Sequence, residues 1–248
     1  MRLSVFVIIL TCLLPAQFSG QGGRANANEI LKQADRARAG GLPGVTWKVH
    51  LVSTDDGGEV TRDMIIKAAD DDSRVEFLAP PKVKGQRMLI AGRNMWFAQP
   101  GLEKPIPISP RLRLSGQAAN GDIASTNYSR DYEPSLIGEE TVHGQQCYVL
   151  DLRATNKSVT YDRIVYWVSK SLLTGVQADF YTVSGKKFKT ARFEYENNIE
   201  YQGRRFPFIS KMTIVDAIHT ANRTVMEYRD VKVGVIPAAE FNINLLLR

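Results

Sequence analysis

Most of this chain alternates apolar and polar residues in short segments, and turn signals separate the segments at intervals of roughly 10–20 residues. The segment 45–51, VTWKVHL, is typical, because every second residue is apolar and would face a core while the others face water. Beyond this segment no helix-length pattern separates consecutive strands, so neighbours are expected to pair antiparallel. The pattern predicts a mainly β protein and excludes a coiled coil or a disordered chain.

About eleven strands can be counted between residues 45 and 233, and a sheet of that size must curl, close or split into layers. One helix is expected over residues 26–40, where apolar residues recur at helical spacing from Ile30 to Ala37. We therefore predict a curved antiparallel sheet that forms an incomplete, unclosed β-barrel of about eleven strands. The helix and an irregular lid would cover a hydrophobic cavity, and residues 28–248 would form one domain.

Residues 100–135 interrupt the strand pattern. Proline is too dense there for central strands, yet the segment also carries many apolar residues. A long apolar connection inside a compact domain is usually a lid, a binding loop or a plug. We predict that this insert is a lid and that Leu114 and Ile123 are its contacts with the cavity.

The N-terminus has the pattern of a secretory signal peptide. Arg2 precedes ten apolar residues, 5–14, which are too few to span a bilayer. We predict a signal peptide over residues 1–27 and therefore export; a retained anchor and lipidation at Cys12 are the alternatives. Cleavage would leave Cys147 alone, in a strand pattern where a buried structural thiol is expected.

Aromatic residues and methionines on the strands suggest a cavity for an apolar ligand, with an ordinary packed core as the alternative. The choice of strand face is open, because a shift of one residue exchanges the two faces. The predicted lining residues are Trp47, Val49, Met88, Ile90 and Trp96.

Two further features belong to the same region. Segments 88–90 (MLI) and 95–97 (MWF) are apolar on both faces, so their outer face should be covered as well, or meet a partner or lipid. Arg93 and Arg111 would contact an acidic head group or tether the insert, and an ordinary surface charge is the alternative for each. The net charge of +6 suits anionic lipid head groups, but it is also normal for a solvated surface.

No catalytic motif is evident. The three histidines, His50, His143 and His219, lack zinc-binding spacing, and there is no nucleophile elbow, P-loop or dinucleotide fingerprint. No run of basic residues indicates nucleic-acid binding. We expect a protein that is not an enzyme, with no metal site, cofactor or nucleic-acid partner.

The central motifs resemble the bacterial outer-membrane lipoprotein-sorting family of the LolA-like superfamily, over roughly residues 28–245. The motifs are specific as a set, and they are Gly92 to Phe97, Lys104 to Ile106, Ile108 to Arg111, Asn120 to Ala124, Gly138 to Glu140, Cys147 to Leu152, Tyr161 to Ile164, Phe180 to Tyr181, Ser184 to Lys186 and Lys189 to Arg192.

This resemblance implies an incomplete β-barrel of about eleven strands, with helices that close a hydrophobic cavity for acyl chains. It also implies a periplasmic location, no catalysis, and association with inner-membrane transporters of the resistance-nodulation-division type. The proline-rich insert stands where LolA itself has a long helical lid, so the cargo is either an acylated lipoprotein or another lipidic molecule. The expected function is a periplasmic carrier between an inner-membrane transporter and the outer membrane. The alternative is a periplasmic adaptor of a transporter or envelope complex that carries nothing.

Overall fold

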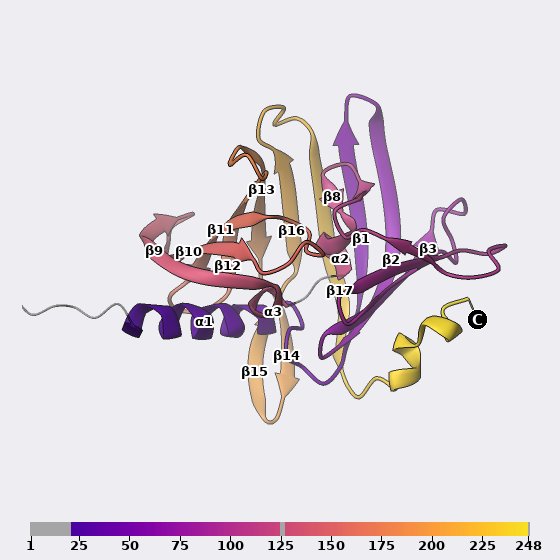
Figure 1. The fold of residues 1–248 in the computed structure, drawn as a ribbon, viewed down its shortest axis with the longest axis horizontal. Helices are drawn as coiled ribbons and strands as arrows, with labels where there is room; N and C mark the ends of the chain where they lie inside the picture. The colour runs from indigo at the N-terminus through magenta and orange to yellow at the C-terminus, as the bar shows by residue number, and fades with distance from the viewer. Residues whose placement is uncertain (1–20, 125–126, 248) are drawn as a thin grey trace, which may run out of the picture.

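The computed structural model describes residues 21–124 and 127–247. Figure 1 shows one large curved sheet with a helix, α1, along one end and a short C-terminal segment at the other. The elements are α1 (Gln21–Arg36), β1 (Val45–Asp55), β2 (Gly58–Ala69), β3 (Asp72–Ala79), β4 (Arg87–Ala91), β5 (Asn94–Ala98), β6 (Ile106–Ile108), β7 (Arg113–Ser115), β8 (Ala118–Ala119), α2 (Asn120–Ala124), α3 (Tyr128–Asp131), β9 (Tyr132–Val142), β10 (Gln145–Ala154), β11 (Arg163–Ser169), β12 (Gly175–Tyr181), β13 (Lys187–Glu194), β14 (Asn197–Tyr201), β15 (Arg204–Phe208), β16 (Lys211–Asp216), β17 (Arg223–Val233), η1 (Ala238–Phe241) and η2 (Ile243–Leu245).

The main sheet has 13 strands in the order β6-β5-β4-β3-β2-β1-β17-β16-β13-β12-β11-β10-β9. Neighbouring strands pair antiparallel, and β6 and β9 remain as separate edges, so the sheet is curved but not closed into a barrel. The predicted fold class is therefore confirmed. The sheet exceeds the expected eleven strands partly because β6 extends it into the proline-rich insert. Proline has no backbone N–H to donate to a neighbouring strand. An edge strand such as β6 tolerates Pro107, because it has a neighbour on one side only.

The inner face of the sheet carries the core. Trp47 lies opposite Ile66, and Val49 opposite Met64, so the alternation predicted for β1 continues across β2. Helix α1 closes one end of this face, where Leu31 and Ala34 are fully buried and the helix runs beside β9 (Figure 1). The burial of one stripe of α1 explains the helical spacing of its apolar residues.

The alternating pattern predicts two continuous strands, 186–198 and 205–216, but in the structure a hairpin leaves the main sheet there. Strands β14 and β15 pair only with each other and project beside α1 (Figure 1). The amide Nδ2 of Asn197 fixes the base of the hairpin, because it donates to the carbonyl oxygens of Ile209 at 2.8 Å and Tyr228 at 2.7 Å. The two predicted strands are thus each broken into two.

The C-terminal segment covers the outer face of β3–β5, as the apolar character of both faces predicted. Leu246 is buried there against Leu89 and Ala98. The carboxylate of Glu240 lies 2.6 Å from Lys67 Nζ and 2.6 Å from Arg74 Nη1. These ion pairs hold the segment on strands β2 and β3.

The insert docks through short elements. The sequence of residues 122–127 also suggests a short helix, and the structure has α2 there, with α3 following after residues outside the described part of the chain. Helix α2 packs so closely that a Cβ on Gly121 would lie 1.8 Å from Thr160 Oγ1 and 3.0 Å from Thr160 Cβ.

We therefore expect Gly121→Ala to lower the free energy of unfolding by about 1–3 kcal/mol, since the backbone or Thr160 must move. Chemical denaturation measures this change. The matched control is Gly138→Ala, where no atom lies within 4 Å of the new Cβ. Equal stability of the two variants would show that α2 does not need this close approach.

The predicted signal sequence lies largely outside the described residues, including Cys12, and helix α1 begins at Gln21. Within the described residues, no helix combines the length and apolar character that a membrane crossing requires. The single domain over residues 28–248 stays a prediction. Cys147 is fully buried, and burial raises the pKa of its thiol, as expected of a structural cysteine.

Candidate functional site

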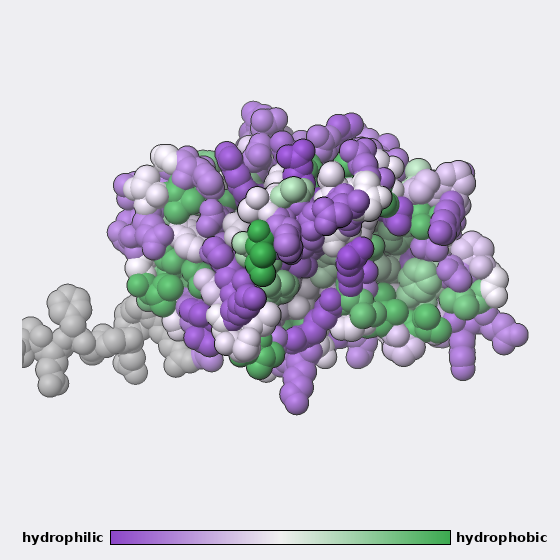
Figure 2. Space-filling model, turned by 90° about the horizontal axis from the view of Figure 1, so that it is seen from above, coloured by the Kyte–Doolittle hydropathy of each residue, from purple (hydrophilic) through white to green (hydrophobic). Residues whose placement is uncertain are grey.

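An open groove with a volume of about 240 Å³ lies between the inner face of β3–β6 and the insert. Apolar side chains dominate its lining, and its only ionisable members are two arginines. The lining residues are Arg62, Phe77, Val83, Gln86, Met88, Phe97, Ile108, Leu112, Arg113, Leu114 and Asn120. Figure 2 shows apolar side chains gathered toward the end of the molecule that holds β2 and β3, on a face that is otherwise largely polar.

Strand register builds the floor of this groove. Val75 lies opposite Met88, and Met88 lies opposite Phe97, so these three side chains share the inner face. The insert supplies the other wall through Leu112 and Leu114, and Leu112 remains 54% exposed. An apolar wall left this open to water favours the binding of an apolar group.

The groove is smaller than the 300–1,000 Å³ that pockets for drug-sized ligands usually have. It has room for part of one hydrocarbon chain rather than for the whole of a large lipid. Each CH₂ group that the groove buries would contribute about 0.8 kcal/mol to binding.

Two arginines reach the groove from different elements. Arg62 lies opposite Leu51, so it takes an inward position on β2, and its Nη1 donates to the carbonyl oxygen of Thr61 at 3.0 Å. Arg113 is exposed on β7. Neither guanidinium has an acidic partner among the residues that the structure describes. The site therefore combines an apolar floor with positive charge.

Three of the predicted cavity residues lie in the packed core instead. Trp47 and Val49 are 2% and 1% exposed, and the Trp47 ring packs edge-on against Phe208 with a centroid distance of 5.7 Å. Ile123 is 3% exposed in the same core cluster. Of the predicted contacts, the structure brings only Met88 and Leu114 together in the groove.

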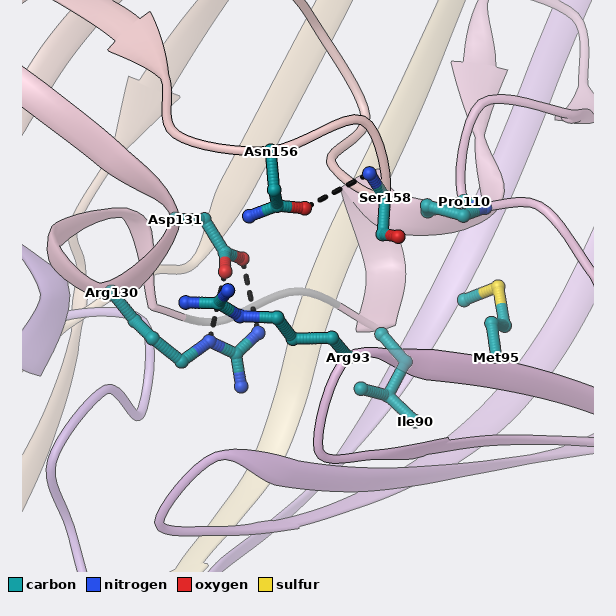
Figure 3. Close-up of a pocket in the computed structure, with 8 residues that line it drawn as sticks. All are labelled: Ile90, Arg93, Met95, Pro110, Arg130, Asp131, Asn156 and Ser158. Atoms are coloured by element: carbon teal, nitrogen blue, oxygen red, sulfur yellow. Dashed lines mark hydrogen bonds and ion pairs between the residues drawn. The ribbon is translucent and has the colours of Figure 1, made fainter.

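Ile90 and Arg93 line a second hollow, which has a volume of only about 10 Å³. Figure 3 shows the Arg93 side chain running toward Arg130 and Asp131, which form a bidentate ion pair with N···O distances of 2.9 and 3.0 Å. A space of this size accommodates about one water molecule. We therefore place no ligand there.

The remaining two predicted site residues, Trp96 and Arg111, make structural contacts, and Trp96 also lines, together with Arg93, a separate open groove of about 250 Å³. Trp96 lies on the outer face of β5, opposite Leu89 and against the C-terminal segment, because residues 95 and 97 occupy the inner face. Arg111 forms a bidentate ion pair with Asp162, at 2.7 and 2.9 Å. This pair lowers the pKa of Asp162 and ties the insert to the chain that precedes β11. Arg111 is thus placed where it can tether the insert.

Below the groove the core contains buried polar groups. Asp122 accepts hydrogen bonds from the hydroxyl of Tyr161 at 2.8 Å and from the N–H of Ala119 at 2.8 Å. Burial raises the pKa of Asp122, and the nearby charge of Lys189 opposes that rise. Lys189 Nζ donates to the carbonyl oxygen of Gln117 at 2.5 Å, which fixes the base of the insert. These groups hold the insert in place over the sheet.

Sequence reasoning missed most of the groove. Phe77 follows the alternation of β3, so periodicity could have found it, whereas Phe97 and Ile108 lie in segments whose sequence does not alternate. Arg62 precedes Met64 by two residues and Ile66 by four along β2, so the alternation places all three side chains on the same inner face. Arg113 has no such signal, since its position depends on how the insert folds. Among the described residues no group of three or more potential ligand side chains could hold a metal ion.

Comparisons with known proteins identify the class of fold and then the family. A family model described as an uncharacterized protein matches residues 69–248. No curated protein matches the chain. The crystal structure of a LolA superfamily protein from Nitrosomonas europaea superposes with a TM-score of 0.77 at 32% identity, covering 88% of this chain and 98% of that one.

Two other crystal structures share the fold. A protein domain from Vibrio parahaemolyticus, described as an outer membrane lipoprotein-sorting domain, has a TM-score of 0.76 at 23% identity and covers 91% of this chain and 100% of its own. A DUF1329 family protein from Desulfovibrio piger has a TM-score of 0.75 at 20% identity, with coverage of 90% and 99%. The fold is thus LolA-like. The chain belongs to the LolA superfamily, as the resemblance of its central motifs indicated.

Proposed function

We propose that this protein is a periplasmic carrier that binds the hydrocarbon part of a lipid or acylated lipoprotein in the groove between β3–β6 and the insert. It would receive its cargo from an inner-membrane transporter, such as one of the resistance-nodulation-division type, and deliver it toward the outer membrane. The open apolar groove is the observation that carries this proposal. Membership of the LolA superfamily and the lipoprotein-sorting description of one structural relative support it.

The small size of the groove suits a carrier. A sixteen-carbon chain buried along its whole length would gain roughly 12 kcal/mol, which would make release slow. Partial burial leaves affinity in a range where cargo can be passed on. The insert forms one wall, so a movement of the insert would change how much of the chain is covered.

The packed core also supports a second candidate, a periplasmic adaptor that carries nothing. Trp47 and Val49 fill part of the inner face, so they leave no room for hydrocarbon at their own positions. An adaptor would leave the groove empty in the cell and would not take up an acyl probe. The same experiment therefore separates the two functions.

The test is titration of the purified protein with a fluorescent fatty-acyl probe, together with mass spectrometry of lipids extracted from it. We expect saturable binding, and we expect Leu112→Asp to weaken it about tenfold or more, because a charge enters the apolar wall. The matched control is Leu172→Asp, since Leu172 is 57% exposed in the turn between β11 and β12, compared with 54% for Leu112. The absence of bound lipid and of probe uptake would favour the adaptor, and equal binding by both variants would place the ligand elsewhere.

A further inference from the structure

We propose that the groove selects single-chain amphiphiles with an anionic head group, which Arg62 and Arg113 bind while the chain lies on Met88, Phe97 and Leu112. This inference rests on the proposed function and adds the chemical class of its ligand. It concerns a different pair of arginines from the Arg93 and Arg111 that the sequence suggested.

The composition of the lining favours an anionic ligand. Seven of the lining residues are apolar, two are neutral amides and two are arginines, and no lining residue carries a carboxylate. A neutral amphiphile would need only the apolar floor. A cationic one would be repelled by both arginines, so the charge of the groove is complementary to a carboxylate or a phosphate.

The two guanidinium groups have N–H donors that are available to a ligand. A guanidinium has five N–H donors, and the one recorded hydrogen bond of the Arg62 side chain goes to a neighbouring backbone carbonyl. Arg113 is exposed and, like Arg62, has no acidic partner among the described residues. Arg111, which lies two residues from Arg113, is by contrast paired with the carboxylate of Asp162.

The other cation near Arg113 is already balanced by acidic groups. Burial lowers the pKa of Lys189, the charges of Asp122 and Asp216 raise it, and the charge of Arg113 has a smaller lowering effect. The Lys189 ammonium is already held by the carbonyl oxygen of Gln117 and faces Asp122. Arg62 and Arg113 therefore remain as the groups that can turn to a head group at the mouth of the groove.

The size of the groove limits the ligand to one chain. Its volume of about 240 Å³ lies below the usual range for drug-sized ligands, so two acyl chains side by side would not fit. Fatty acids and lysophospholipids with acidic head groups have the required chemistry. Phospholipids with two chains would have to leave at least one chain in solvent.

The experiment compares three ligands with chains of the same length: laurate, dodecyl phosphate and the neutral monoacylglycerol monolaurin, by calorimetry at about pH 8, where the carboxyl group is ionised. We expect at least one anionic ligand to bind about tenfold or more tightly than monolaurin. A preference for laurate alone would identify a carboxylate head group, and a preference for dodecyl phosphate alone would identify a phosphate. Raising the ionic strength from roughly 0.05 to 0.5 M should weaken the anionic ligands but not monolaurin.

The decisive variant is the double substitution Arg62→Gln/Arg113→Gln, which should abolish the preference for anionic ligands over monolaurin. Arg62→Lys/Arg113→Lys should retain part of it, since the charge remains while the bidentate geometry is lost. The matched control is Arg204→Gln/Arg205→Gln, which makes the same change of charge at exposed positions on the β15 side of the projecting hairpin. The control should keep the full preference.

The outcomes separate this inference from the proposed function. If monolaurin binds as tightly as the anionic ligands, or if the double variant keeps the preference, the assignment of Arg62 and Arg113 is wrong while the groove still binds chains. If none of the three ligands binds the wild-type protein, the proposed function itself fails.

Discussion

Replacing Trp47 by alanine is expected to lower the free energy of unfolding by about 3–5 kcal/mol. The side chain is 2% exposed and packs edge-on against Phe208, so its removal would leave a cavity between β1 and the base of the projecting hairpin. This change also separates two interpretations of Trp47. Truncation of a residue that lined an empty ligand cavity would change the free energy of unfolding little. Truncation of a core residue removes both buried apolar area and packing contacts, so it lowers the free energy of unfolding more.

Chemical denaturation followed by circular dichroism measures the effect. Trp47→Phe is the matched variant, because it keeps a ring against Phe208 and removes an indole N–H that has no hydrogen-bond partner among the described residues. We expect that variant to lie within about 1.5 kcal/mol of the wild type. A cost below about 1 kcal/mol for the alanine variant would mean that Trp47 faces open space, as the sequence first suggested.

The strands could be predicted from the sequence because a half-buried strand repeats every two residues. Strand β1 shows that repeat along most of its length, and β2 and β17 show it over residues 64–68 and 224–228. Pairing partners could not be predicted in the same way. The alternation runs on through residues 195 and 196, so nothing in it shows that β14 pairs with β15 rather than with the main sheet. Contacts at the base of the hairpin hold this pairing, among them the hydrogen bonds from the Asn197 amide to two carbonyl groups.

The candidate site was predicted less well, for two physical reasons. The segment 95–97 is apolar on both faces, so its sequence cannot show that Trp96 points outward; a C-terminal segment far along the chain covers that face. The wall that faces Met88 comes from the insert, whose short strands follow no periodic pattern. Its position depends on contacts such as Gly121 against Thr160 and Lys189 against Gln117, which link distant parts of the sequence.

One buried carboxylate should make the stability of the fold depend on pH. Asp35 of α1 is 3% exposed and accepts the backbone N–H groups of Tyr128 at 3.0 Å and Ser129 at 2.7 Å, so it ties the helix to the end of the insert. Burial raises the pKa of Asp35 to about 6, although these two hydrogen bonds and the charge of Arg38 act in the opposite direction. The carboxyl group therefore binds its proton more tightly in the folded than in the unfolded protein.

The direction in which stability changes with pH follows from this difference in proton affinity. Between about pH 4 and pH 6 the folded state holds more protons at Asp35 than the unfolded state does, so stability falls as the pH rises through this window. The protonated carboxyl makes its full contribution to the free energy of unfolding below pH 3.8, the pKa of the unfolded state. This contribution is lost above about pH 6, the pKa of the folded state. A difference of roughly two pKa units corresponds to a loss on the order of 3 kcal/mol.

The measurement is the free energy of unfolding of the wild type and of Asp35→Asn at intervals from pH 4 to pH 7. The difference between the two proteins cancels the other titrating groups, and we expect it to shift by on the order of 3 kcal/mol in favour of the asparagine variant as the pH rises. Asp56→Asn, in the exposed turn between β1 and β2, is the matched control for the same chemical change at the surface. A constant difference for Asp35→Asn would mean that the carboxylate is solvated in the folded protein, and that α1 and α3 do not exclude water from the junction they form.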